Sequence, residues 1–112
     1  QLRRLPQEGA PAETHFHFGD IEVDLAQRSL TRNGELVRLT PIEYRLLCAM
    51  LAAPGKVLTY RHLLRAVWGN AFVESNHYLR IYVSHLRQKL EDDPAQPRFF
   101  VTETGVGYRL DI

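Results

Sequence analysis

At 112 residues, the chain has room for one hydrophobic core and is too short for two domains of ordinary size. Hydrophobic residues make up 45% of it, which excludes a wholly disordered chain, and the formal net charge of +1 indicates no particular partner. No apolar run is long enough to span a bilayer, and the first residues lack the apolar centre of a signal peptide. We therefore expect a soluble, cytoplasmic protein without membrane contact.

The residue types that build catalytic and metal sites are sparse. Cys48 is the single cysteine, which excludes an internal disulfide, and its apolar neighbours predict a small buried hydrophobe. His15 and His17 are two apart on a predicted strand and share a face, but no third ligand of suitable type is identified nearby. No nucleophile elbow or phosphate loop occurs. We expect no metal, no cofactor and no enzymatic activity.

Residues 1–14 differ in composition from the rest of the chain. They are rich in Pro, Glu, Gln and Ala, show no periodicity and begin with Gln, which predicts a linker from a longer protein. Residues 15–112 form the one predicted domain. Alternation from His15 and the Asn33-Gly34 pair, a type I′ hairpin signal, predict an antiparallel sheet of about four strands. Its apolar face is expected to carry Phe16, Phe18, Ile21, Val23 and Leu25.

Two short helices are predicted next. Thr40, Pro41 and Glu43 form a capping box with proline at the first helical position, and this helix should end before Pro54-Gly55. Its apolar positions are Ile42, Leu46, Leu47, Met50 and Leu51. Residues 56–58 form a short extended piece. A second helix over residues 60–68 is then capped by Thr59 and stopped by Gly69.

A longer amphipathic helix is predicted over residues 75–91, with Ser75 or Asn76 able to cap it. Its apolar stripe consists of Leu79, Tyr82, Val83, Leu86 and Leu90, and the opposite side carries His77, Arg80, Ser84, Arg87 and Gln88. Such a rod fits the DNA major groove, and its polar side chains can bond to bases and phosphates. A solvated surface helix shows the same pattern, so this helix alone does not decide the function. The charge is also less basic than that of many nucleic-acid-binding domains, with nine Lys/Arg against seven Asp/Glu after Thr40.

The chain ends in a predicted hairpin. Residues 98–103 and 108–110 read as strands, and the glycines of the TGVG segment at residues 104–107 permit a tight turn. Two short helices, a long polar-faced helix and a glycine-tipped hairpin together predict a winged helix-turn-helix. The predicted fold class is thus α+β, with an N-terminal four-stranded antiparallel sheet, three helices and a C-terminal β-hairpin wing.

Five segments resemble the C-terminal effector domains of OmpR/PhoB-type response regulators. They are LTPIEYRLL from residue 39, GKVLT from 55, VWG from 67, HLRQKL from 85 and TGVGYR from 104, in the family's order and spacing over residues 16–110. Within the family, residues 77–82 and 102–109 look most like regulators of potassium uptake operons. The resemblance implies sequence-specific binding of double-stranded DNA, with the long helix in the major groove and the wing near the minor groove, and control of transcription.

The same resemblance implies partners. A missing N-terminal receiver domain would be phosphorylated by a sensor kinase, and two effector domains would then bind tandem direct repeats as a dimer, the isolated domain being monomeric. The loop at residues 69–74 resembles the loop that meets RNA polymerase in relatives.

Three residues are candidate base contacts on chemical grounds. Arg80 and Ser84 lie one turn apart on the outer face; arginine can bond bidentately to guanine, and serine is less selective. Ile81 points away from the apolar stripe, where it could meet a thymine methyl or another part of the protein.

Further site residues follow from the resemblance. Arg87 matches a recurrent arginine that contacts phosphate or base in relatives. The helical spacing itself places His77 on the outer face, and His85 is included among the groove contacts although the family pattern gives least guidance there. Trp68, Thr102, Gly105 and Tyr108 are assigned to phosphates, although core packing explains Trp68 equally well.

Two positions depart from the family pattern. Many relatives carry arginine where this chain has His85 and Thr104, so Thr104 is a groove contact without the cation that a narrow minor groove attracts. Glu103 beside it should repel phosphates. We expect the wing to add little sequence preference. A protein-interaction module using the same fold is the alternative to DNA binding, and salt dependence separates the two.

Overall fold

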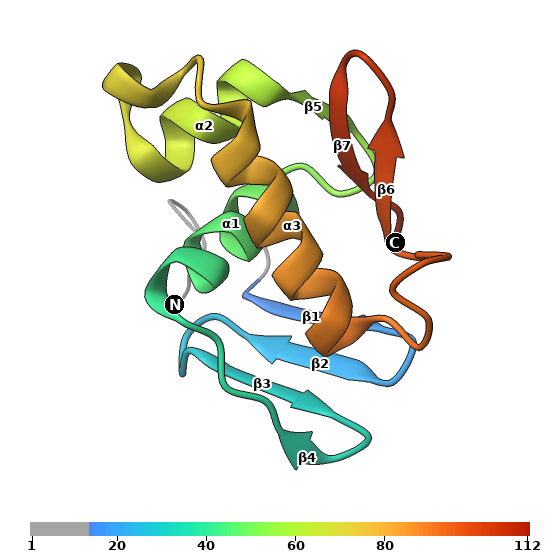
Figure 1. Ribbon diagram of the computed structural model, residues 1–112. Coiled ribbons are helices and arrows are strands. Elements are labelled where there is room, and N and C mark those ends of the chain that lie inside the picture. Colours follow the sequence, from blue (N-terminus) through green and yellow to red (C-terminus); the bar gives the residue numbers. More distant parts are fainter. Residues whose placement is uncertain (1–13) are drawn as a thin grey trace, which may run out of the picture. The chain divides into compact units, whose positions relative to one another are not determined.

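The computed structural model describes residues 14–112, which fall into two compact units with the boundary between Arg38 and Leu39 (Figure 1). The predicted linker lies outside the described residues except for Thr14, and its assignment remains a prediction. The predicted fold class is confirmed: a four-stranded antiparallel sheet occupies the first unit, and three helices with a C-terminal hairpin occupy the second.

The first unit is a meander of β1 (His15–Phe18), β2 (Ile21–Asp24), β3 (Ser29–Arg32) and β4 (Glu35–Leu36). Asn33 and Gly34 both have positive φ, 54° and 79°, as the predicted type I′ turn requires. The alternation is confirmed for Phe18, Ile21 and Val23, which are buried, whereas Phe16 and Leu25 are half-buried.

The second unit contains the winged helix-turn-helix. Its elements are α1 (Pro41–Leu51), β5 (Val57–Thr59), α2 (Tyr60–Trp68), the 3₁₀ turn η1 (Asn70–Phe72), α3 (Asn76–Leu90), β6 (Phe100–Glu103) and β7 (Gly107–Leu110). The strand order β5-β7-β6 shows that the predicted extended piece joins the wing hairpin as a third strand. In Figure 1, α3 runs across the helical unit and the hairpin stands to one side of it.

The starts of α1 and α2 are as predicted. The Thr40 hydroxyl accepts the Glu43 backbone N–H at 3.3 Å, and the Glu43 carboxylate accepts the Thr40 N–H at 3.0 Å, completing the capping box. The Thr59 hydroxyl accepts the His62 N–H at 3.0 Å. The start of α3 differs from expectation, because Ser75 occupies the cap position without a side-chain hydrogen bond.

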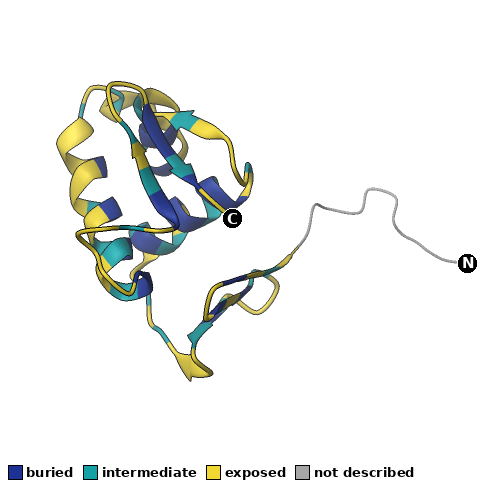
Figure 2. Cartoon of the chain, turned by 90° about the vertical axis from the view of Figure 1, so that its right-hand side faces the viewer, coloured by how far each residue is buried: buried dark blue, intermediate teal, exposed yellow. Residues whose placement is uncertain are grey.

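The core of the second unit lies between the helices and the hairpin. In Figure 2 this unit is dark blue toward its interior and yellow along its outer surface. The fully buried large side chains of this unit are Leu46, Leu47, Met50, Leu51, Leu63, Leu64, Leu79, Leu86, Leu90, Phe100 and Leu110. Three predicted core residues, Ile42, Cys48 and Tyr82, are only half-buried, so the expectation of a buried Cys48 was wrong.

The two wing glycines have different roles. Gly105 has a φ of 79° and provides the turn, as predicted. Gly107 serves a close strand approach: a Cβ there would lie 1.8 Å from the Leu58 backbone oxygen. Gly107 therefore lets β5 pair with β7, where Thr59 faces it.

Candidate nucleic-acid interface

The outer face of α3 is a continuous exposed strip. Leu79, Val83, Leu86 and Leu90 are buried on the inner side, whereas the exposed residues are Asn76, His77, Tyr78, Arg80, Ile81, Ser84 and Gln88. The predicted amphipathic pattern is thus confirmed over most of the helix. Ile81 is 47% exposed, so the alternative that it packs elsewhere in the described unit loses support.

Arg80 and Ser84 lie on this strip, one turn apart and exposed. Neither forms a hydrogen bond or ion pair with any residue that the structure describes. Their donors are therefore available to a ligand, and the fixed fork of Arg80 suits a planar acceptor pair such as guanine O6 and N7. His77 lies at the start of the strip, and the centre of its ring is 4.3 Å from the ring centre of Tyr78.

Arg87 is held differently, against the wing. Its Nε and Nη2 donate to the Phe100 carbonyl at 3.0 and 2.6 Å, and Nη2 also donates to the Thr102 hydroxyl at 2.7 Å. Its guanidinium carbon lies 5.9 Å from the Tyr108 ring centre. Burial lowers the pKa of Arg87, which nevertheless stays charged near neutral pH. Arg87 therefore joins α3 to β6 before any ligand is present.

His85 and Lys89 meet α1 at Glu43. The buried Glu43 carboxylate lies 3.2 Å from His85 Nδ1 and 2.6 Å from Lys89 Nζ. Burial by itself raises the pKa of Glu43, but the hydrogen bonds from Lys89 and the Thr40 N–H, with the positive charges nearby, lower it overall. The structure therefore gives His85 a partner within the protein and does not bring it together with Arg80 and Ser84.

Glu91 is a second buried carboxylate, at the end of α3. It accepts the backbone N–H groups of Arg98, Phe99 and Phe100, each at 2.8 Å. Three such bonds satisfy a carboxylate away from water and fix the segment that leads into β6. Both buried acids position α3, and sequence reasoning missed these roles. Glu43 could have been found, because it lies on the apolar stripe of α1 at the spacing of Leu46, Leu47 and Met50.

The wing tip exposes Thr104, Gly105 and Val106. Glu103 is paired, because Arg109 Nε lies 2.9 Å from its carboxylate, and Arg109 also meets Asp111 at 3.1 Å. The predicted repulsion between Glu103 and phosphates is therefore weakened by a neighbouring cation, although this cation is itself shared with Asp111. No unpaired cation occupies the described wing tip.

Trp68 belongs to an aromatic cluster between α2 and α3. Its ring centre lies 6.2 Å from that of Tyr78 and 5.5 Å from that of Tyr82, and the second contact agrees with the predicted place of Tyr82 on the apolar stripe of α3. Trp68 itself is half-buried, so both packing and a phosphate contact remain open to it. Phe72 of the 69–74 loop extends this cluster and is 37% exposed.

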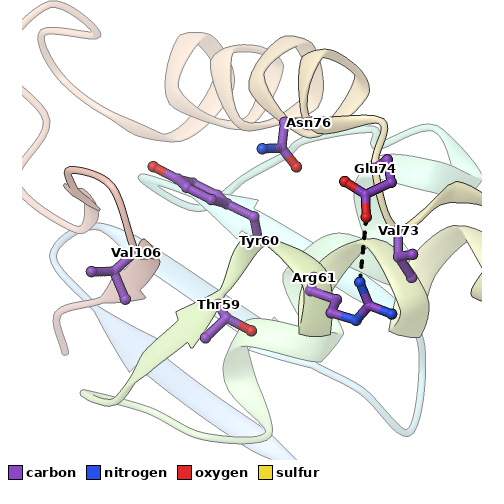
Figure 3. Close-up of a pocket in the computed structure, with 7 residues that line it drawn as sticks. All are labelled: Thr59, Tyr60, Arg61, Val73, Glu74, Asn76 and Val106. Atoms are coloured by element: carbon purple, nitrogen blue, oxygen red, sulfur yellow. Dashed lines mark hydrogen bonds and ion pairs between the residues drawn. The ribbon is translucent and has the colours of Figure 1, made fainter.

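Two cavities open beside the start of α3. One, of about 260 Å³, is drawn in Figure 3 and contains the Arg61–Glu74 pair at 3.5 Å. The other, of about 360 Å³, lies between α3 and the wing and is lined by Tyr60, Asn76, Arg80, Arg87, Thr102 and Tyr108. The structure thus brings four predicted site residues together around one hollow, along with Tyr60, which no sequence motif singled out.

Within residues 14–112, no group of three or more His, Cys, Asp or Glu side chains is arranged to hold a metal ion. None of the described helices is both long and apolar enough to cross a bilayer.

Fold and site together define a winged helix-turn-helix whose third helix exposes a polar strip that includes Arg80. Residues 34–110 match the family described as "Transcriptional regulatory protein, C terminal". The chain is 58% identical over 109 residues to the KDP operon transcriptional regulatory protein KdpE of Escherichia coli, covering 97% of this chain and 48% of that protein. The chain thus spans about half the length of this curated relative.

Solved structures agree. The response regulator DrrB of Thermotoga maritima, described as an OmpR/PhoB homologue, matches with a TM-score of 0.79 and 28% identity, over 88% of this chain and 45% of that one. The DNA-binding domain of the response regulator AdeR was solved in complex with an intercistronic region. It matches with a TM-score of 0.70 and 30% identity, over 86% of this chain and 98% of that one. The chain belongs to the OmpR/PhoB family of response-regulator DNA-binding domains. Its relatives are transcription regulators and not enzymes.

Proposed function

We propose that this chain binds double-stranded DNA sequence-specifically, with α3 in the major groove and the wing near the minor groove, and so controls transcription. The observation that carries the proposal is the unneutralised Arg80 on the exposed strip of α3, one turn from Ser84 and beside the exposed Ile81. The guanidinium of an arginine can donate to both major-groove acceptors of guanine. A serine hydroxyl can bond to any of the bases, and an apolar side chain can contact a thymine methyl.

The remaining site residues divide by their position. His77 lies at the groove-facing start of α3, whereas Arg87 has its guanidinium at the wing, where the backbone of DNA would pass. Thr102, Gly105 and Tyr108 of the wing are assigned to phosphates, and Trp68 contributes from the end of α2. Thr104 would lie near the minor groove, where it offers an uncharged hydroxyl in place of a positively charged side chain. His85 supports α3 through Glu43, and any base contact by His85 would compete with this bond.

The proposed partners are those of a longer protein in which this chain would be one domain. A receiver domain phosphorylated by a sensor kinase would bring two effector domains, monomeric when isolated, to tandem direct repeats as a dimer in the bacterial cytoplasm. The likeness to a KDP operon regulator supports a potassium uptake operon as the target. The loop at residues 69–74 would meet RNA polymerase, and the exposed Phe72 supports a protein contact there.

The test is binding of this chain to a random-sequence duplex and to a duplex enriched by selection, each at several salt concentrations. We expect affinity to fall steeply with salt for both duplexes, and the enriched duplex to bind at least about 10³-fold more tightly at equal salt. A domain that binds protein partners without retarding either duplex, and whose complexes are insensitive to salt, would contradict the proposal in favour of a protein-interaction module.

A further inference from the structure

Gln88 points directly away from the core side of α3. At about 100° per residue, it lies about 180° round the helix from the buried Leu79 and within about 20° of Ile81, which is 47% exposed. Gln88 is itself exposed. When a helix lies in the major groove, side chains in the middle of its outer face meet base edges, whereas those at its margins meet phosphates. Gln88 therefore occupies a base-facing position, one turn beyond Ser84.

The side chain of Gln88 is available to a ligand. Its amide forms no hydrogen bond or ion pair with any residue that the structure describes. Both of its chain neighbours are engaged, because Arg87 donates to the Phe100 carbonyl at 3.0 and 2.6 Å and Lys89 lies 2.6 Å from the Glu43 carboxylate. A glutamine amide presents an acceptor oxygen and a donor nitrogen side by side. This pair matches N6 and N7 of adenine in the major groove.

His85, on the same half of α3, is turned toward the protein instead. Its Nδ1 lies 3.2 Å from the buried carboxylate of Glu43, and its ring centre lies 5.2 Å from that of Tyr82. Movement of His85 into the groove would separate it from this carboxylate, whereas Gln88 has no such contact to lose. The structure therefore favours Gln88 over His85 as the reader of a base in this half of the helix.

We propose that Gln88 is a specificity-determining residue of the DNA interface and that it reads an adenine in the major groove. This inference rests on the proposed function, because it requires α3 to lie in that groove. Arg80 and Gln88 are eight residues apart, or about 12 Å along the helix axis, and bases stack about every 3.4 Å. An α3 that runs along the groove then places this adenine about three to four base steps from the guanine proposed for Arg80.

Gln88→Ala tests the assignment, and Gln96→Ala makes the same change at an exposed position after α3. Each variant and the unaltered chain select duplexes from a random pool. We expect Gln88→Ala to lose an adenine preference at one base step and to bind the duplex enriched by the unaltered chain at least about fivefold more weakly. Its other preferences and its salt slope should stay unchanged, because no charge is removed. Gln96→Ala should behave as the unaltered chain does.

Two further variants sharpen this result. Gln88→Arg should change the preferred base at the same step from adenine to guanine, because an arginine suits the two acceptors of guanine. His85→Ala should keep the adenine preference. Loss of that preference in His85→Ala but not in Gln88→Ala would overturn the proposal, as would a Gln88→Ala variant that keeps every preference of the unaltered chain.

A second measurement locates the contact. 7-Deazaadenine, which still pairs with thymine but lacks N7, replaces the adenines of the enriched duplex one at a time, and each modified duplex is bound to the unaltered chain and to Gln88→Ala. We expect one position per bound domain at which the base change weakens the unaltered chain by about two- to tenfold and leaves Gln88→Ala unaffected. Additive effects at every position would contradict the adenine contact while leaving DNA binding intact. Failure of the unaltered chain to bind any duplex would instead contradict the proposed function.

Discussion

The two sides of α3 carry cations in opposite circumstances. Toward α1, His85 and Lys89 meet the buried carboxylate of Glu43 at 3.2 and 2.6 Å. Toward the wing, Arg87 bonds to a carbonyl and a hydroxyl, and Arg80 bonds to nothing in the described residues. The helix is thus neutralised where it must hold the fold, and its charge is left uncompensated where DNA would approach.

This difference separates stability from binding. A cation paired with a buried acid has its charge satisfied inside the protein, whereas a cation bonded to neutral groups keeps its full charge for an external anion. Substitutions on the α1 side should therefore change folding much more than DNA affinity. Substitution of Arg80, which bonds to no described residue on the wing side, should do the reverse.

The largest effect is expected for Glu43→Ala. It removes half of the capping box and leaves Lys89 without its carboxylate, so the free energy of unfolding should fall by about 2 to 3 kcal/mol. Urea denaturation measures this, with Glu22→Ala on an exposed strand position as the matched control, expected within about 0.5 kcal/mol. DNA affinity measured well below the denaturation midpoint should hardly change. A large loss of affinity with little loss of stability would reverse the assignment of the two sides.

Arg87→Ala comes next. It removes a positive charge from the side of α3 that faces the wing, together with the link to Phe100, so we expect DNA affinity to fall by at least about tenfold and the salt slope to decrease by about one unit. Arg98→Ala removes the same charge from an exposed position outside the site and serves as the control. If both variants lost affinity equally, Arg87 would act only through net charge.

Acid should destabilise the fold through Glu43, by less than the alanine substitution does, because protonation keeps the side chain in place. A carboxyl whose pKa is lowered in the folded state stabilises that state above its ordinary pKa of about 4, and this contribution disappears as pH falls through the lowered value. Urea midpoints measured between neutral pH and about pH 3 should therefore fall less in Glu43→Gln than in the unaltered chain. Parallel curves for the two proteins would show that Glu43 has no part in acid unfolding.

The smallest effect is expected at the wing tip. Thr104 is exposed and uncharged, so Thr104→Ala should change affinity by less than about twofold and leave the preferred sequence unaltered, whereas Thr104→Arg should strengthen binding and steepen its salt dependence. Duplex selection with each variant decides this. A change of preferred site in Thr104→Ala greater than that in Arg80→Ala would show that the wing carries the specificity.

The sequence predicted the local elements well because their signals are local. Thr40 and Glu43 indicate the start of a helix, and Asn33-Gly34 indicates a type I′ turn. The spacing of the apolar residues indicates the inner face of α3. The cap of α3 was less predictable, since Ser75 has the right chemistry but its side chain makes no capping bond. Gly107 looked like part of the turn, and only the approach of β5 reveals its steric role.

The candidate site was only partly predictable, because its residues come together through tertiary contacts. Arg87 has the residue type of a DNA contact, but its bonds to Phe100 depend on where β6 packs. Tyr60 gave no signal at all, being the first residue of a helix distant in sequence from the wing. His85 could not be separated from Arg80 by helical position alone, since its partner lies on α1.

The most direct test of the account is selection of bound duplexes from a random pool by the unaltered chain and by Arg80→Ala in parallel. The account predicts that Arg80→Ala loses its preference at one base step, at a cost of about 1 to 3 kcal/mol for the original site, and keeps its preferences elsewhere. Uniform weakening across all sequences, with every base preference retained, would contradict it and would make Arg80 a contact to the DNA backbone only.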